Sequence, residues 1–139
     1  MGKLQASLVI VLFVLVTANL ARDGITSSLA APSGLALNVN SSLADATDIA
    51  PGDGVCETGP GNATCTLRAA IMEANASPGQ DTIHVPSGTF TLTRIGYDNS
   101  AVNGDLDILD DLILQGVSYD DTFIDGNGVV TQGRVFHIH

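Results

Sequence analysis

The chain has 139 residues, which is the size of one domain, and its 15 acidic against five basic residues give a net charge of −10. Thirteen of the 15 acids are aspartate, which suits turns and contacts to water or metals better than helices. Such a chain is repelled by phosphate backbones and anionic lipid, so nucleic acid is excluded as a natural partner. Aromatic residues make up 4% of the chain, which counts against stacking on sugars.

Residues 1–30 have the pattern of a signal peptide and leader. Lys3 supplies a positive start, and Leu8 to Val16 is an unbroken apolar run. Small residues that suit cleavage follow at Ala18, Ala21 and Ala30, and the sequence does not choose among them. A membrane anchor is the alternative, but spanning a bilayer takes about 20 mainly apolar residues, and polar side chains interrupt this stretch on both sides. We expect an exported protein that is secreted or held at the cell surface or outer membrane.

The mature chain is predicted to begin with a half-buried strand over residues 35–39, where apolar and polar side chains alternate. A glycine-rich loop over residues 44–54 follows and carries Asp45, Asp48 and Asp53. Carboxylate oxygens are the ligands that calcium prefers, so this loop is a candidate calcium site. The spacing is not that of an EF-hand loop, and a solvated turn is the alternative. No other cofactor is expected.

The two cysteines are Cys56 and Cys65. An even pair in an exported chain predicts a disulfide, which would tie an irregular loop to the residues that follow. A zinc site would need two further ligands from His84, His137 and His139. A redox centre would need a Cys-x-x-Cys spacing, which these positions do not have.

A short helix is predicted over residues 66–76. Apolar residues recur at i, i+3, i+4 and i+7 from Leu67, which places them on one helix face. Thr66 is placed to cap the first turn, and Pro78 marks the end. Because Ala69 stands where a capping box would have glutamate, the helix should be slightly weakened.

After the helix, short apolar segments separated by Gly or Asp turns predict a β architecture. The expected strands cover residues 82–85, 89–93, 106–108, 112–114, 122–124 and 134–138. Strands of about three or four residues with mixed spacing favour the short faces of a β-solenoid over the hairpins of a sandwich. Residues 112–116 and 123–126 also share an apolar pair that closes on glycine, which is a weak repeat.

Cys65 to Ile71 reads Cys-Thr-Leu-Arg-Ala-Ala-Ile and resembles the Cys-Ser-Leu-Arg-Glu-Ala-Ile motif of the bacterial CSLREAI-type domain. The similarity extends to Gly52–Cys56 before the motif and to short segments after it, through Arg134–Phe136. It implies that residues 31–139 are the N-terminal cap and first coils of a right-handed parallel β-helix, mainly β with one capping helix. A solenoid needs at least about three repeats, so we expect a truncated protein whose partners include downstream coils of the full-length chain.

Two further groups of residues have side chains that could bind a metal or take part in catalysis. His137 and His139 lie two apart on an expected strand, so their rings share one face and could ligate a metal together; solvent-facing polar positions are the alternative. Asp105 and Asp107 head a set of acids such as glycoside hydrolysis requires, but an exposed strand face explains them without catalysis. No catalytic residue is expected within these residues.

Three functions follow from these observations. The first is a non-catalytic N-terminal portion of an exported β-helix protein with a structural or adhesive role. The second is the N-terminal part of a carbohydrate-active enzyme, a polysaccharide lyase or glycosidase, with its active site beyond residue 139. The third is a calcium-stabilised binding module. Any polysaccharide or host-surface ligand is expected to bind through coils outside this sequence.

Overall fold

The computed structural model describes residues 34–139, so the leader predicted over residues 1–30 lies outside the described part. Within residues 34–139, no helix is long and apolar enough to cross a membrane. The elements are β1 (Ala36–Asn38), α1 (Leu67–Ala76), β2 (Asp81–Val85), β3 (Gly88–Thr91), β4 (Leu106–Ile108), β5 (Leu112–Gly116), β6 (Thr122–Asp125) and β7 (Phe136–Ile138). Each strand and the helix lies where the sequence pattern predicted one, with boundaries that differ by at most two residues.

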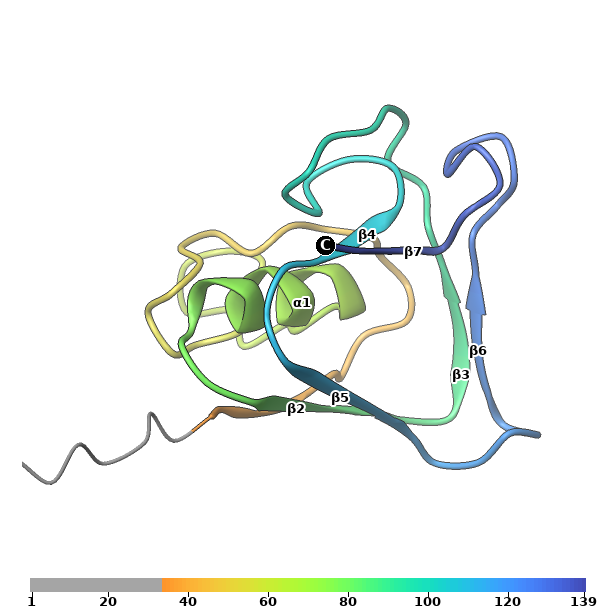
Figure 1. Cartoon of the computed structure of the whole chain (residues 1–139). Helices are drawn as coiled ribbons and strands as arrows, with labels where there is room; N and C mark the ends of the chain where they lie inside the picture. Colours follow the sequence, from red (N-terminus) through yellow and green to blue (C-terminus); the bar gives the residue numbers. More distant parts are fainter. Residues whose placement is uncertain (1–33) are drawn as a thin grey trace, which may run out of the picture.

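The strands form small parallel sheets with the orders β1-β2-β5, β3-β6 and β4-β7 (Figure 1). Strands β2, β3 and β4 lie in three different sheets, and each pairs with a strand that comes later in the chain. In the largest sheet, Ile83 lies between Leu37 and Leu114. Apolar side chains at paired positions therefore share the face that packs inward.

The predicted right-handed parallel β-helix is wrong for the described residues. The strands belong to separate sheets of two or three strands each, and no sheet closes or continues as a solenoid. The solenoid was suggested by short apolar strands that are separated by Gly or Asp turns. Any arrangement of short parallel strands is compatible with this pattern. It does not require a continuous stack of coils, and the structure satisfies it with three small sheets.

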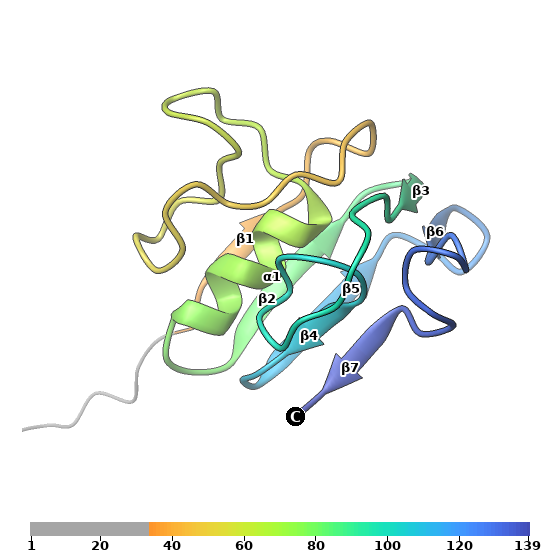
Figure 2. The same cartoon turned by 90° about the horizontal axis from the view of Figure 1, so that it is seen from above.

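Helix α1 runs alongside β1 and β2 and contacts β2 and β4 (Figure 2). Its cap is the predicted one, because Thr66 Oγ1 accepts from the Ala69 N–H at 3.1 Å and also donates to the Ala46 carbonyl at 2.6 Å. Ala69 is fully buried, so a capping-box glutamate at this position would have its charge buried away from water, which is costly. The fully buried Ile71 and Ile83 join the helix to the largest sheet in one apolar core.

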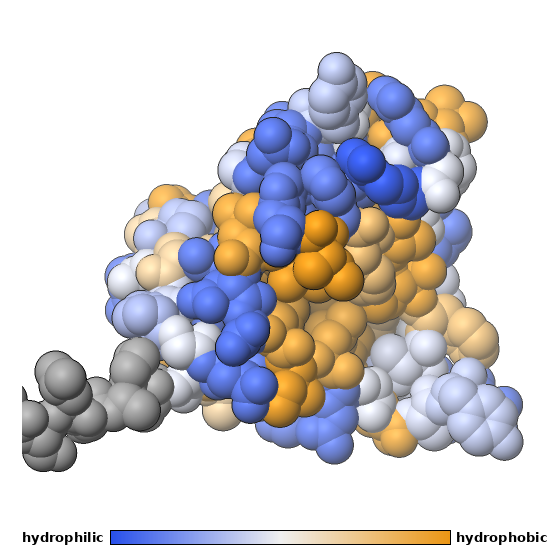
Figure 3. Space-filling view, in the orientation of Figure 1, coloured by the Kyte–Doolittle hydropathy of each residue, from blue (hydrophilic) through white to orange (hydrophobic). Residues whose placement is uncertain are grey.

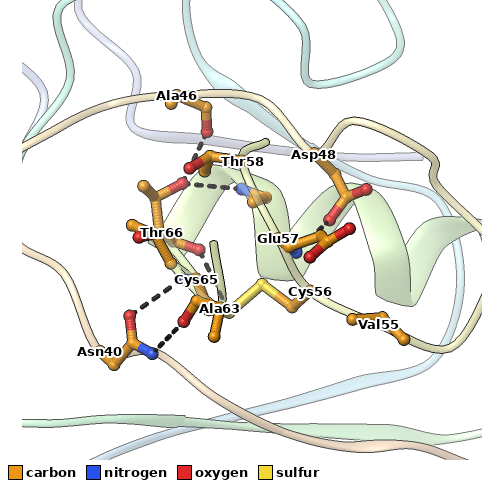
Figure 4. Close-up of a disulfide and its surroundings, with 12 residues drawn as sticks. Asn40, Ala46, Asp48, Val55, Cys56, Glu57, Thr58, Ala63, Cys65 and Thr66 are labelled. Atoms are coloured by element: carbon orange, nitrogen blue, oxygen red, sulfur yellow. Dashed lines mark hydrogen bonds between the residues drawn. A yellow bond between two sulfur atoms is a disulfide. The ribbon is translucent and has the colours of Figure 1, made fainter. Parts of the chain in front are cut away.

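The predicted disulfide between Cys56 and Cys65 is present (Figure 4). Asn40 fixes the segment beside it, since its Nδ2 donates to the Ala63 carbonyl at 2.8 Å and its Oδ1 accepts from the Cys65 N–H at 2.9 Å. The loop between the two cysteines is thereby tied both to the start of α1 and to the residues after β1.

Candidate functional site

Three chemistry-bearing side chains converge where β4 and β7 pair. Asp107 and His137 are direct partners in the parallel register. His139 follows β7 and continues the ladder, because its N–H donates to the Ile108 carbonyl at 3.1 Å. Residues two apart on a strand point to the same face, so both imidazoles lie on the side of Asp107.

The three side chains share one carboxylate oxygen. Asp107 Oδ1 lies 3.0 Å from His137 Nδ1 and 2.9 Å from His139 Nε2. The Asp107 side chain is fully buried, whereas those of His137 and His139 are 33% and 30% exposed. The other carboxylate oxygen, Oδ2, accepts from the Ala101 N–H at 3.1 Å, so the loop between β3 and β4 holds the carboxylate in place.

The arrangement offers two nitrogen ligands and one oxygen ligand at one point of the surface. The three ligand atoms lie within 4.8 Å of one another, and within residues 34–139 they form the group of His, Cys, Asp or Glu side chains that could hold a metal ion. Two imidazoles with a carboxylate form a donor set that suits zinc and other divalent transition metals.

A second buried carboxylate lies beside this group. Asp105 is 1% exposed; its Oδ2 accepts from Arg134 Nε at 2.7 Å, and its Oδ1 has no hydrogen-bond partner within the described residues. A polar pocket of about 240 Å³ adjoins the pair and is lined by Tyr97, Asp105, Thr131, Gln132 and Arg134. The expectation that Asp105 and Asp107 occupy an exposed strand face is therefore wrong, because loop residues, Arg134 and the histidines cover both carboxylates.

The predicted calcium ligands Asp45, Asp48 and Asp53 hold three different parts of the chain. Asp45 pairs with Arg68, the buried Asp48 accepts from the N–H groups of Ala50 and Glu57, and the exposed Asp53 accepts from the N–H of Val55. The structure does not bring them together as a group of ligands. Calcium binding at this loop stays a prediction.

Asp107 is the residue that sequence reasoning failed to join to the two histidines. The signal that could have found it is the likeness of Leu106–Ile108 and Phe136–Ile138, in which a polar residue stands between two apolar ones. If these strands pair in parallel without a shift, Asp107 lies opposite His137. Pairing across about 30 residues is not visible in local periodicity, so the sequence pattern alone does not reveal the site.

The chain matches no protein-family model, no curated protein and no solved structure. The resemblance to the CSLREAI-type domain therefore stays a prediction from the motif itself.

Proposed function

We propose that this chain is a non-catalytic part of an exported protein with a structural or adhesive role, and that it assembles by adding parallel strands of a second copy at its open sheet edges. The observation that carries the proposal is the common position of three edge strands. Strands β5, β6 and β7 are each the last strand of their sheet within the described residues. They lie on one side of the molecule, with an apolar area between them (Figure 3).

The apolar area is formed by side chains that extend the core to the surface. Leu114, Ile124 and Phe136 are partly buried and pack against the core cluster. Ile138 on β7 is 74% exposed. An exposed apolar area of this kind on a soluble chain marks an interaction surface.

The edge of β5 lacks the devices that usually prevent strand addition. Natural edge strands carry Lys, Pro or bulges that block pairing with another chain. The β5 sequence Leu-Ile-Leu-Gln-Gly has no charge and no proline, and β7 has neither Lys nor Pro. The free N–H and C=O groups of these strands can therefore pair with another parallel strand.

Export is supported by the disulfide, which forms and persists in oxidising compartments. The acidic composition suits a protein that must stay dispersed outside the cell. A non-catalytic role is supported by the tasks of the buried acids, because Asp45, Asp105 and Asp107 all hold other parts of the chain. The motif resemblance described above agrees with a surface or secreted protein.

Size-exclusion chromatography of the full chain, with light scattering on the eluting peak and EDTA in the buffer, tests the assembly. We expect a concentration-dependent dimer or larger species, and Ile138→Lys should shift it to monomer because a charge then lies within the apolar area. Ile95→Lys is the matched control, since Ile95 is 77% exposed but lies between β3 and β4, outside the three edge strands. A monomer at all concentrations would overturn the assembly, and measurable cleavage of pectin or alginate would overturn the non-catalytic role.

A further inference from the structure

We propose that Asp107, His137 and His139 bind one zinc ion, which fastens β7 to β4. This site is independent of the assembly proposed above, because its ligands lie on the opposite face of β7 from Phe136 and Ile138. Asp107 lies on β4, His137 lies on the paired strand β7, and His139 directly follows β7. A metal ion held by all three therefore crosslinks the two strands.

The spacing of the ligand atoms fits a tetrahedral ion after small adjustments. In a site with metal bonds of about 2.0–2.1 Å, neighbouring ligand atoms lie roughly 3.3 Å apart. The observed separations from Asp107 Oδ1 are 3.0 Å to His137 Nδ1 and 2.9 Å to His139 Nε2. The imidazoles are partly exposed, so rotation about their side-chain bonds can open these contacts by the few tenths of an ångström that an ion requires.

The backbone and the second oxygen of Asp107 already position the site. Ligating carboxylates are usually oriented by a hydrogen bond to their other oxygen, and here the Ala101 N–H donates to Asp107 Oδ2 at 3.1 Å. His137 is fixed by the β4–β7 ladder, and His139 by its N–H bond to the Ile108 carbonyl. The carboxylate side of the site is therefore held by the fold rather than by the ion.

The donor set selects zinc over calcium or magnesium. Imidazole nitrogen suits zinc and its neighbours among the transition metals, whereas calcium takes six to eight oxygen ligands. Three protein ligands leave one position of a tetrahedral ion for water, and the partial exposure of both rings gives an ion access from solvent. The net charge of −10 adds a long-range attraction for any cation.

The ion would stabilise the outermost strand in particular. Within the described residues, β7 is hydrogen-bonded only to β4, and three residues make up the strand. A ligand that binds only the folded state raises stability in proportion to the logarithm of its concentration over its dissociation constant. Zinc should therefore raise the melting temperature and slow amide exchange in residues 134–139 more than in β1.

The test uses the full chain without a histidine tag, dialysed against EDTA and then titrated with Zn²⁺ by calorimetry. Co²⁺ serves as a spectroscopic probe, because a tetrahedral site gives visible d–d absorption. We expect one equivalent of Zn²⁺ and no competition from Ca²⁺. His137→Ala and His139→Ala should each weaken binding at least about tenfold.

His84→Ala is the matched control, since His84 is exposed on β2 and lies between Asn38 and Gln115 in the sheet. Asp107→Asn is a second ligand variant, with folding checked by circular dichroism. Absence of Zn²⁺ binding at micromolar concentrations would overturn the proposal. Equal weakening by His84→Ala would overturn it too, as would binding that survives in the His137→Ala/His139→Ala double variant.

Discussion

Arg68 on α1 and Asp45 in the loop before it form a buried ion pair, in which Nε lies 2.6 Å from Oδ1 and Nη2 lies 3.1 Å from Oδ2. The guanidinium also donates to the carbonyls of Ala101 and Gly104, both at 2.7 Å. Asp45 accepts in addition from the Thr93 N–H at 2.7 Å. One pair of side chains therefore joins the helix to two loops, the loop before α1 and the segment between β3 and β4 that covers Asp107.

Removing one partner of this pair should be strongly destabilising. Asp45→Ala leaves the Arg68 charge buried without compensation, which costs about 3–5 kcal/mol in comparable sites. Asp53→Ala is the control, because the exposed Asp53 accepts one hydrogen bond, from Val55, and its loss should cost about 1 kcal/mol or less. Urea unfolding followed by circular dichroism measures both. If the two variants lost similar stability, the ion pair would not be the anchor of these loops.

The same two variants address the predicted calcium site. If Asp45 and Asp53 ligate calcium together, millimolar calcium should raise the melting temperature of the wild-type chain but of neither variant. The contacts of Asp45 with Arg68 lead us to expect no such rise in any of the three proteins. A rise confined to the wild-type chain would confirm the calcium prediction.

Gly104 is expected to be irreplaceable by alanine. Its φ of +70° is strained for other residues, and a Cβ there would clash with the Gly96 carbonyl oxygen. Its N–H also donates to the Arg94 carbonyl at 2.8 Å. Gly104→Ala should cost at least about 2 kcal/mol or prevent folding. Gly128→Ala, where a Cβ would meet no atom within 4 Å, should change stability by about 0.5 kcal/mol or less.

Reduction of the Cys56–Cys65 disulfide should lower the free energy of unfolding by about 2–3 kcal/mol in the chain-entropy model for a ring of this size. Intact mass after alkylation, with and without a reductant, shows whether the bond is present in the exported protein. Two alkylated thiols without reductant would contradict the assignment. Denaturant unfolding of the oxidised and reduced chains then gives the energy difference.

The helix and the strands could be predicted because their signals are local. Thr66, the apolar spacing from Leu67 and the alternation within each strand are visible within ten residues. The way the strands associate depends on pairing between distant segments, and there the predicted β-helix was wrong. Local periodicity does not distinguish three small parallel sheets from a longer stack.

The buried charges were also beyond prediction, for a related reason. Helical periodicity assigns Arg68 and Glu73 to the polar side of α1, yet both are fully buried. Glu73 accepts from the N–H groups of Gly52 and Gly54, so a distant loop covers it. These side chains lie on the polar side of the helix pattern, yet they are buried because loops distant in the sequence supply their hydrogen-bond partners. No local sequence signal specifies those partners.

Stability should depend on pH through Asp98, which organises the loop above Asp107. Burial raises the pKa of Asp98, but hydrogen bonds from the Ser100 hydroxyl and from the N–H groups of Ser100, Val102 and Asn103 together outweigh it, so the pKa lies below its ordinary value of 3.8. A carboxylate with a depressed folded-state pKa stabilises the protein fully above the unfolded-state pKa, and this contribution is lost as pH falls through the folded-state value.

Asp98→Asn should therefore lower the free energy of unfolding near pH 6, and its deficit relative to wild type should shrink as pH falls below about 4. The amide of the variant side chain cannot ionise, so the wild-type chain alone loses this contribution in acid. The measurement is urea unfolding at several values between about pH 2.5 and 7, with the exposed Asp120→Asn as control. A deficit that stays constant across this range would show that the Asp98 carboxylate contributes by its shape and not by its charge.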